Sequence, residues 1–215
     1  MGLTLVTALY GAHDALWQLP VEHGFDDAVL ITDQDIEVSG WRTVRVAGTG
    51  DDRLDAKAPK LAPWRFVDAE RTAWIDASAE ILDASLHDWL SQHHACDLRA
   101  WPHPEPRACL YEEAAYCQDW PKYAGQPIRQ QVQAYRERGM PGQYGLWACG
   151  TLLWHHTAKA QAFGERWLSE QHEWSIQDQI SLPYLLWSSD IHFEPFHGHQ
   201  YLNQYLRWHS HRRGS

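Results

Sequence analysis

The sequence predicts one α/β domain with a mostly parallel central sheet flanked by helices, and three observations lead to this prediction. Residues 3–10 alternate apolar side chains with threonine, as a buried strand does. Residues 28–32 are apolar throughout, which is typical of a parallel strand covered on both faces. Further apolar runs are separated by stretches with helical spacing, and this alternation indicates a layered α/β sheet.

The first half of the chain supplies most of the expected strands. Pro59 and Pro63 interrupt an otherwise helical stretch, because proline lacks the amide that an inner turn requires. A second helix is expected after the fourth strand, where apolar residues recur at helical spacing. The expected elements are strands at residues 3–10, 28–32, 41–46 and 72–76, and helices at residues 53–67 and 81–90.

The second half is predicted to be richer in helix. Pro127 suits the first position of a helix that Gly139 ends. The expected helices cover residues 108–118, 127–139, 163–174 and 176–187, with extended segments at 145–149, 151–154 and 191–193. We expect one domain over residues 1–205 and a basic, His- and Arg-rich tail over residues 206–215.

Length, composition and charge exclude several classes of protein. With 215 residues, 44% of them hydrophobic, the chain has enough material for a single globular core. A formal net charge of −10 argues against non-specific binding to duplex DNA, which needs a basic face. The four cysteines form no CxxC pair, so we expect buried free thiols in a reducing compartment. We see no signal peptide and no membrane-length apolar run, and therefore expect a cytoplasmic enzyme.

Aromatic residues are unusually frequent, with thirteen Trp and nine Tyr. Most should fill the core, because aromatic side chains bury large areas. Stacking of sugar rings on exposed aromatic faces is the alternative interpretation.

Polar residues follow the first two expected strands. Tyr10, Gly11 and His13 come after the first, and Asp33 comes after the second. Ligands of open α/β sheets bind at these carboxyl ends of the strands, so these residues are where a nucleotide base would lie. Ordinary strand-end turns are the alternative for each of them.

Three cations precede the fourth strand. Arg53, Lys57 and Lys60 lie four and three residues apart, which places them on one face of a helix. Just ahead of a strand that ends in an acid, such a face suits the neutralisation of phosphate groups.

The fourth strand ends at Asp76, and Ser78 follows two residues later. Mg²⁺ and Mn²⁺ prefer oxygen ligands and share substrate phosphates, so this pair is a candidate metal site. A D-x-S sequence is weak by itself, and Asp76 acting only as a turn cap is the alternative. Of the late histidines (residues 197, 199, 209 and 211), we take His197 and His199 as the further candidate ligands.

Asp178 and Gln179 open an expected helix. An acid in the first turn is favoured by the helix dipole, which is a structural explanation. The functional interpretation is that the pair reaches over a bound sugar.

An ordered series of motifs resembles the glycosyltransferase-like domain of the TOD1/MUCI70 family and its bacterial and viral relatives. The series runs K-x-P-K, W-I-D, R-x-C-x-Y-E-E, K-Y, I-x-x-Q-x-x-x-Y-x-x-x-G-x-P and D-Q-x-S, from Lys57 to Ser181. The resemblance extends over roughly residues 3 to 190. It implies a GT-A fold, in which a Rossmann-like nucleotide-binding half merges with an acceptor half. It also implies a nucleotide-sugar donor, with UDP favoured, and a Mn²⁺ or Mg²⁺ ion.

The resemblance also implies roles for particular residues. The Asp178–Gln179 pair is similar to the Asp-Gln of glycogenin-like retaining transferases, so both would contact the donor sugar and a retaining outcome is favoured. Glu112 and Glu113 would lie on the active-site floor or the acceptor side, or in a buried structural network with Arg107. In an inverting reaction Asp178, Glu112 or Glu113 would be the base. Two departures from the family pattern, Gln177 in place of Arg and Ser78 in place of a second acid, weaken the expectations for metal and donor.

The sequence thus predicts a glycosyltransferase that moves a sugar from a nucleotide-sugar donor to a hydroxyl acceptor. The acceptor stays open between a saccharide, a protein, a small molecule and a modified nucleobase, and so does the oligomeric state. Two alternatives are a non-catalytic binding module with a degraded donor site and a metal-dependent phosphoesterase built on Asp76 and the late histidines.

Overall fold

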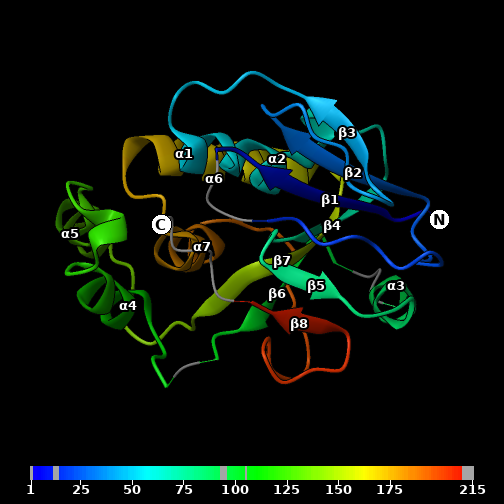
Figure 1. Cartoon of the computed structure of the whole chain (residues 1–215). Coiled ribbons are helices and arrows are strands. Elements are labelled where there is room, and N and C mark those ends of the chain that lie inside the picture. The colour runs from blue at the N-terminus through cyan, green and yellow to red at the C-terminus, as the bar shows by residue number, and fades with distance from the viewer. Residues whose placement is uncertain (1, 12–14, 93–95, 105, 210–215) are drawn as a thin grey trace.

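The computed structural model describes residues 2–11, 15–92, 96–104 and 106–209. Its central feature is a six-stranded sheet with the order β3-β2-β1-β4-β7-β6 (Figure 1). The first four strands in this order are mutually parallel, and β7 is antiparallel to both β4 and β6. The strands are β1 (Thr4–Leu9), β2 (Asp27–Thr32), β3 (Arg42–Arg45), β4 (Arg71–Ile75), β6 (Leu98–Pro102) and β7 (Trp147–His155). The prediction of an α/β domain with a mostly parallel central sheet is confirmed.

Helices cover one face of this sheet. Helix α2 (Lys57–Leu61) contacts β1, helix α7 (Asp178–Trp187) contacts β7, and α6 (Ala158–Glu173) lies against both helices. Adjacent residues of a strand point to opposite faces. Val6 and Trp74 accordingly belong to the core beneath these helices.

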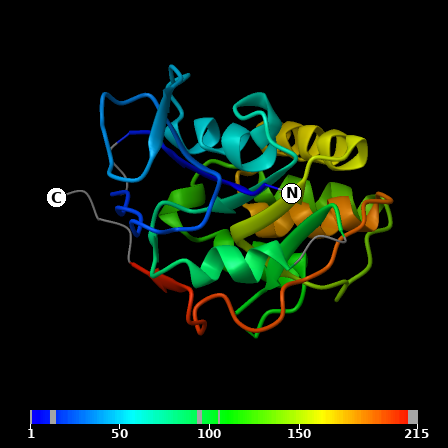
Figure 2. The same ribbon diagram turned by 90° about the vertical axis from the view of Figure 1, so that its right-hand side faces the viewer.

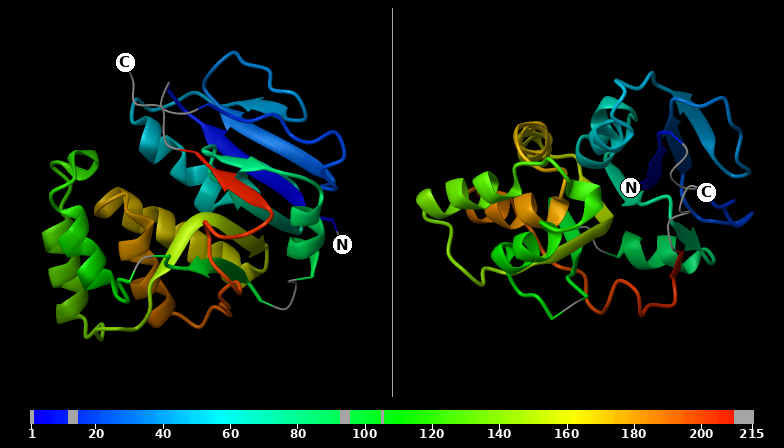
Figure 3. Two further views of the ribbon diagram at one scale, coloured as in Figure 1. Left: turned by 60° about the horizontal axis from the view of Figure 1, so that its bottom comes forward. Right: turned by 60° about the vertical axis from the view of Figure 1, so that its left-hand side comes forward.

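A second core lies on the other face. Leu5 and Ala73, next in sequence to the residues just named, pack there with Leu86 and Leu206. The elements that cover this face are α3 (Ser85–Ser91) and a two-stranded antiparallel sheet of β5 (Ala79–Ile81) and β8 (Leu206–Trp208). Figure 3 shows β8 lying beside β5, and Figure 2 shows the chain after α7 running along one side of the domain to β8.

The remaining helices lie beyond one end of the sheet (Figure 1). Helix α4 (Leu110–Cys117) packs on α5 (Ile128–Glu137) and on α7. The short elements α1 (Asp52–Asp55), η1 (Pro63–Arg65) and η2 (Pro121–Tyr123) complete the described fold. All four cysteines are buried and free, as expected from their spacing. Within the described part of the chain, no helix is both long and apolar enough to cross a membrane.

Several predicted elements are corrected. The expected helix at 53–67 is divided into α1, α2 and η1, and the expected helix at 81–90 begins only at Ser85, because Ile81 belongs to β5. The two extended segments at 145–149 and 151–154 form the single strand β7, and β6 was not predicted. The expected strand at 191–193 is wrong, since only Phe193 makes an isolated bridge, to Leu98.

The predicted boundary between domain and tail is also wrong. Residues 206–208 form β8, which pairs with β5 in the register Ala79↔Trp208. This segment therefore belongs to the folded domain. Residues 210–215 lie outside the described part.

Close approach of α6 to α2 depends on Gly164. A methyl group at this position would overlap the carbonyl oxygen of Leu61 and the indole of Trp64. We expect Gly164→Ala to destabilise the protein. Alanine improves helix propensity by about 1 kcal/mol, but overpacking against backbone costs about 1–3 kcal/mol.

Thermal unfolding measures this effect. We expect the Tm of Gly164→Ala to fall by a few degrees, at about 2–4 °C per kcal/mol for a chain of this size. Gly142→Ala is the matched control, because nothing lies within 4 Å of a methyl group there. An unchanged or raised Tm for Gly164→Ala would contradict the packing described.

Candidate functional site

A cavity of about 660 Å³ opens where β1 and β4 end. Ala8 of β1, Trp74 of β4 and Asp76 just after β4 line it. Because β7 is antiparallel to β4, its early residues Cys149 and Gly150 reach the same end of the sheet. Ligands of open α/β sheets bind outside the carboxyl ends of the strands, so the fold places this cavity where a ligand is expected.

Two lysines and two aspartates form a connected network in the cavity. The Lys57 Nζ donates to Asp178 Oδ1 at 2.8 Å, and the Lys60 Nζ lies 2.8 Å from Asp178 Oδ2. The Lys60 Nζ also donates to Asp76 Oδ1 at 3.1 Å. Lys57 and Lys60 are one turn apart on α2 and Asp178 opens α7, so the network joins two helices to the end of β4.

Burial and charge set the ionisation of this network. Although burial opposes ionisation of the carboxyl, the ammonium groups of Lys57 and Lys60 lower the pKa of Asp178 to about 2. Burial also disfavours the charged form of Lys60, but the negative charges of Asp178 and Asp76 outweigh it and raise the pKa of that lysine. Burial raises the pKa of the Cys149 thiol, so this thiol is uncharged at neutral pH and is not an activated nucleophile.

The cavity is positively charged in an acidic protein. Its described lining residues include four cations, Arg53, Lys57, Lys60 and Lys122, and two carboxylates, Asp76 and Asp178. Four positive against two negative charges leave a net charge of +2, whereas the whole chain carries −10. The Arg53 Nη1 donates to the carbonyl of Lys122 at 3.1 Å, which joins α1 to η2 around the mouth of the cavity. Such a local field attracts an anionic ligand.

Only one of the two carboxylate oxygens of Asp76 accepts hydrogen bonds from the described residues. Its Oδ1 accepts from the Trp74 Nε1 at 2.6 Å as well as from Lys60, and its amide donates to the carbonyl of Gly150 at 2.9 Å. No described residue hydrogen-bonds to Asp76 Oδ2, and the side chain is 37% exposed. Among the described residues, one carboxylate oxygen of this cavity-lining residue is therefore without a partner.

The residues around Asp76 fit a divalent cation only in a limited way. Ser78 lines the same cavity but is nearly buried, and among the described residues no three His, Cys, Asp or Glu side chains gather as metal ligands. Magnesium-type ions are commonly held by one or two carboxylates together with substrate phosphates. The residues present thus fit a cation that a bound diphosphate helps to hold, and they do not form a complete protein cage.

The late histidines are placed differently from the prediction. His197 and His199 are not among the residues that line the cavity, and His199 Nδ1 accepts from the amide of Tyr201 at 3.1 Å. His209 is the described histidine that lines the cavity. Its Nε2 lies 2.9 Å from Glu80 Oε2, and its ring stacks on Trp17 at 4.1 Å.

The residues predicted to hold a nucleotide base lie at the strand ends but do not line the cavity. Tyr10 and Asp33 follow β1 and β2, and burial together with the charges of Asp55 and Asp33 raises the pKa of Tyr10 to about 12. Asp33 Oδ1 is a buried atom with no partner among the described residues. Gly11 has a φ of +63°, and its carbonyl accepts from the Gln34 amide. His13 lies outside the described residues, and the role of all four in base binding stays a prediction.

Glu112 and Glu113 make hydrogen bonds at the start of α4 and beside it. Glu113 is buried and accepts from Arg107 Nε at 2.7 Å and from Gln177 Nε2 at 2.8 Å. Glu112 accepts from the amide of Ala108 at 2.8 Å and braces the start of α4. Neither lines the cavity. Glu113 thus belongs to a buried network with Arg107, whereas Glu112 is exposed, and a catalytic role for either residue stays a prediction.

Asp178 and Gln179 both line the cavity, but their contacts differ. Each carboxylate oxygen of Asp178 is engaged by a lysine, and a pKa of about 2 makes this group a poor base. The half-buried Gln179 side chain has no hydrogen bond to any described residue, so its amide is available to a ligand.

Comparison with protein-family models identifies the family of this chain. The model of the TOD1/MUCI70, glycosyltransferase-like domain, matches residues 21–202. The chain belongs to this family. Among solved structures, the crystal structure of mouse xyloside xylosyltransferase 1, in its apo form, matches with a TM-score of 0.49 and 8% sequence identity. That match covers 91% of this chain and 84% of the mouse chain. A search of the curated proteins found no match.

Several lining residues of this TOD1/MUCI70 domain were not predicted as site residues. Lys122 and Tyr123 belong to the K-Y motif of the family resemblance, so a signal for them was present. Cys149 and Gly150 reach the cavity only through the antiparallel course of β7. Gln200, Tyr201 and Trp208 come from a segment whose fold was not predicted; its richness in aromatic residues was a signal for Tyr201 and Trp208 but not for Gln200.

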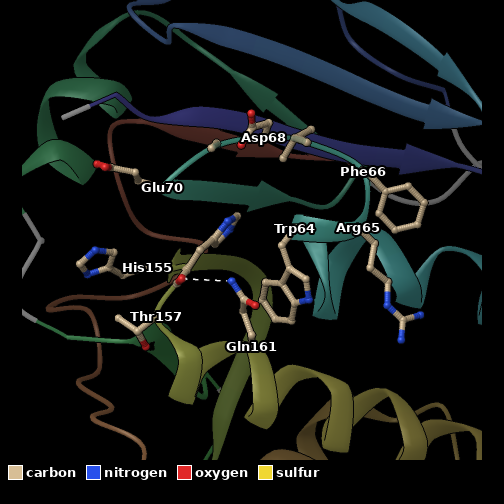
Figure 4. Close-up of a pocket in the computed structure, with 11 residues that line it drawn as sticks. Trp64, Arg65, Phe66, Asp68, Glu70, His155, Thr157 and Gln161 are labelled. Carbon is tan, nitrogen blue, oxygen red and sulfur yellow. Dashed lines mark hydrogen bonds between the residues drawn. The ribbon is translucent and has the colours of Figure 1, made fainter.

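A second hollow of about 940 Å³ lies at the other end of β4 (Figure 4). It is formed by Trp64 and Glu70 on one side and by His155, Thr157 and Gln161 on the other. None of the described lysines lines it, and it lies at the amino end of β4. The charged network, the family motifs and the carboxyl strand ends all point to the smaller cavity instead.

The network around Asp178 makes stability depend on pH. The pKa of Asp178 falls from its ordinary 3.8 to about 2 on folding, so its contribution is fully present above about pH 4. That contribution, about 2 kcal/mol, is lost as the pH falls from about 4 through 2. We expect Asp178→Asn to lower the free energy of unfolding at pH 7 and to remove this part of the acid dependence.

Urea denaturation between pH 2 and 7 measures the effect. Asp190→Asn is the control, because this carboxylate makes an exposed ion pair with Lys159 on the surface. If Asp178→Asn and Asp190→Asn gave the same pH profile as the unmodified protein, the buried network would not have the energetic role assigned to it.

Proposed function

We propose that this chain is a GT-A glycosyltransferase that moves a sugar from a UDP-sugar to a hydroxyl acceptor. The observation that carries the proposal is the cavity with four cations and two carboxylates at the carboxyl ends of β1 and β4. A nucleoside diphosphate is the kind of anion that such a site suits, and membership of a glycosyltransferase-like family supports this choice.

The basic residues would hold the diphosphate. Lys122 and Arg53 line the cavity from η2 and α1, and Lys57 and Lys60 extend from α2 beneath them. Negative charge builds on the leaving diphosphate as the glycosidic bond breaks. Fixed positive groups stabilise that charge without having to reorganise during the reaction.

A Mn²⁺ or Mg²⁺ ion would assist at Asp76. The free Oδ2 of Asp76 is the ligand that this chain offers, with the Ser78 hydroxyl and the diphosphate oxygens as further ligands. When bound, such an ion supplies additional positive charge for the leaving group.

Asp178 and Gln179 would divide two tasks. Asp178 holds the ammonium groups of Lys57 and Lys60 in place, and the Gln179 amide binds hydroxyl groups of the donor sugar. In the transfer, the bond between the anomeric carbon and the phosphate oxygen breaks and the acceptor oxygen bonds to that carbon. Because both oxygens of Asp178 are bound to lysines, the hydroxyl proton passes to the leaving phosphate, which is compatible with a retaining outcome.

One observation favours the alternative of a nucleotide-sugar-binding module without catalysis. Ser78 stands where a second carboxylate would complete the metal ligands, and it is nearly buried. A phosphoesterase is less favoured, because His209 is the one described late histidine that lines the cavity, and its Nε2 lies 2.9 Å from Glu80 Oε2. Release of UDP from UDP-glucose, UDP-galactose or UDP-xylose distinguishes a transferase from both, since a binding module releases none and a phosphoesterase that hydrolyses the diphosphate releases UMP and a sugar 1-phosphate.

The metal is expected to bind together with the nucleotide. Mn²⁺ alone should leave the Tm unchanged, whereas Mn²⁺ added to UDP should raise the Tm above the value with UDP alone, because ligands that bind the native state stabilise it. Asp76→Asn should abolish this Mn²⁺-dependent increment and keep the shift that UDP causes alone.

Asp35→Asn is the control for this experiment, because that carboxylate is exposed and pairs with Arg45 on the surface. An unaltered Mn²⁺ increment in Asp76→Asn would show that the metal assignment is wrong.

The basic residues make a separate prediction about affinity. Lys122→Gln should raise the Kd for UDP about tenfold in calorimetry without added metal, since a charge-assisted hydrogen bond contributes about 1.5–3 kcal/mol. Lys159→Gln, which removes an exposed lysine near Asp190, should leave the Kd within about twofold. Equal effects of the two substitutions would refute a specific role of the basic residues in diphosphate binding.

A further inference from the structure

The segment before and within β8 forms a second, uncharged wall of the cavity. Gln200, Tyr201 and Trp208, here called the aromatic wall, line it together with His209. The four cations come instead from α1, α2 and η2. The cavity therefore joins a basic part, suited to a diphosphate, to a neutral part of different chemistry.

Backbone pairing fixes the aromatic wall beside Asp76. Trp208 pairs with Ala79, and the amide of His209 donates to the carbonyl of Ser78 at 3.0 Å. The amide of Ala79 in turn donates to the carbonyl of Asp76 at 2.9 Å. The segment after Asp76 thus positions β8, and the wall is part of the folded site.

The wall is also braced internally and against β7. The Trp208 Nε1 donates to the carbonyl of Gln200 at 2.9 Å. The indole of Trp208 lies against Gly150, where any β-carbon would overlap it. The carbonyl of Gly150 also accepts from the amide of Asp76. Trp208 and Asp76 therefore both contact the same residue of β7. A preformed wall loses little conformational entropy when a ligand binds.

Gln200 presents an unsatisfied acceptor. Its side chain is 4% exposed and lines the cavity, yet its Oε1 has no hydrogen-bond partner among the described residues. A buried polar atom without a partner costs about 1–3 kcal/mol, so such atoms call for a functional explanation. A ligand hydroxyl that donates to this oxygen supplies one.

Tyr201 adds an accessible aromatic ring. It is 51% exposed and packs edge-to-face on Trp208, with ring centroids 5.6 Å apart and planes at 86°. The apolar CH face of a sugar ring packs on such aromatic surfaces, while its hydroxyls reach neighbouring amides. An aromatic ring next to a buried amide oxygen is therefore suited to a polyhydroxylated ring.

The charge distribution decides between acceptor classes. Arg207, which precedes Trp208 directly in the sequence, is paired with Glu80 at 3.2 Å. No lysine, arginine or carboxylate belongs to the aromatic wall itself. A polyanionic nucleic acid has no described countercharge on this wall, whereas a neutral saccharide needs none.

We propose that Gln200, Tyr201 and Trp208 form the acceptor subsite, and that it binds a neutral saccharide. This inference rests on the proposed function, because an acceptor subsite has meaning only beside a donor site. The acceptor hydroxyl approaches the donor sugar from the aromatic wall, with the amide of Gln200 orienting it. The inference selects the saccharide among the acceptors that the sequence left open.

Saturation-transfer NMR on the UDP-bound protein tests the proposal without requiring the donor sugar. The probes are the methyl glycosides of glucose, galactose, mannose and xylose at millimolar concentration. We expect saturation to reach the ring protons of at least one of them. Tyr201→Ala and Gln200→Leu should each lower that signal several-fold while the Kd for UDP changes less than about twofold.

Leu202→Ala is the matched control, because Leu202 is 79% exposed and adjacent in sequence but does not line the cavity. It should leave the saccharide signal unchanged. With a UDP-sugar that the enzyme turns over, Tyr201→Ala should raise the KM for the same glycoside about tenfold and leave the donor KM unchanged.

Four results would overturn the inference. The first is that no glycoside receives saturation, and the second is that Tyr201→Ala keeps the full signal. The third is that the substitutions raise the Kd for UDP instead, which would assign the wall to the donor. The fourth is that a single-stranded oligonucleotide or a Ser-containing peptide, and no saccharide, binds at Tyr201. Failure of the proposed function itself is distinct, because UDP would then not bind at all.

Discussion

The salt-bridge network of Lys57, Lys60, Asp178 and Asp76 is the interaction on which the rest of the site depends. It connects α2 and the end of β4 to α7, which begins about a hundred residues later in the sequence. Two buried ammonium groups at one helix turn repel each other and lose hydration. Asp178 compensates both at once, and Asp76 adds a second negative charge beside Lys60.

This network also explains the division of roles among the acids. In the proposed reaction, a carboxylate that anchors two lysines is a poor proton acceptor, so we assign Asp178 a positioning role. Asp76 keeps one oxygen free because only its other oxygen is bound by Lys60 and Trp74. Glu113 forms a comparable network with Arg107 and Gln177, but outside the cavity. Three carboxylate groups thus differ in their surroundings, and their hydrogen-bond partners decide the difference.

The cavity combines two surfaces of different origin. The charged part comes from α1, α2, η2, the start of α7 and the end of β4. The last described strand supplies the aromatic part by pairing with β5, which begins three residues after Asp76. The short strand β5 therefore matters for the site, because its pairing fixes β8 close to Asp76.

The sequence by itself determined the class of fold, the parallel strands β1, β2 and β4, and the grouping of Arg53, Lys57 and Lys60 near Asp76. These features depend on local periodicity and on short spacings along the chain, which a sequence displays directly, although Arg53 lies on α1 and the two lysines lie on α2. Only the tertiary structure decided that Glu112 and Glu113 lie outside the cavity, that His209 replaces His197 and His199 at its wall, and that Gln200, Tyr201 and Trp208 join it. Those contacts arise from the antiparallel course of β7 and from the β5–β8 pairing across more than a hundred residues. No local pattern encodes such pairings, because they are selected by the burial of side chains from distant segments.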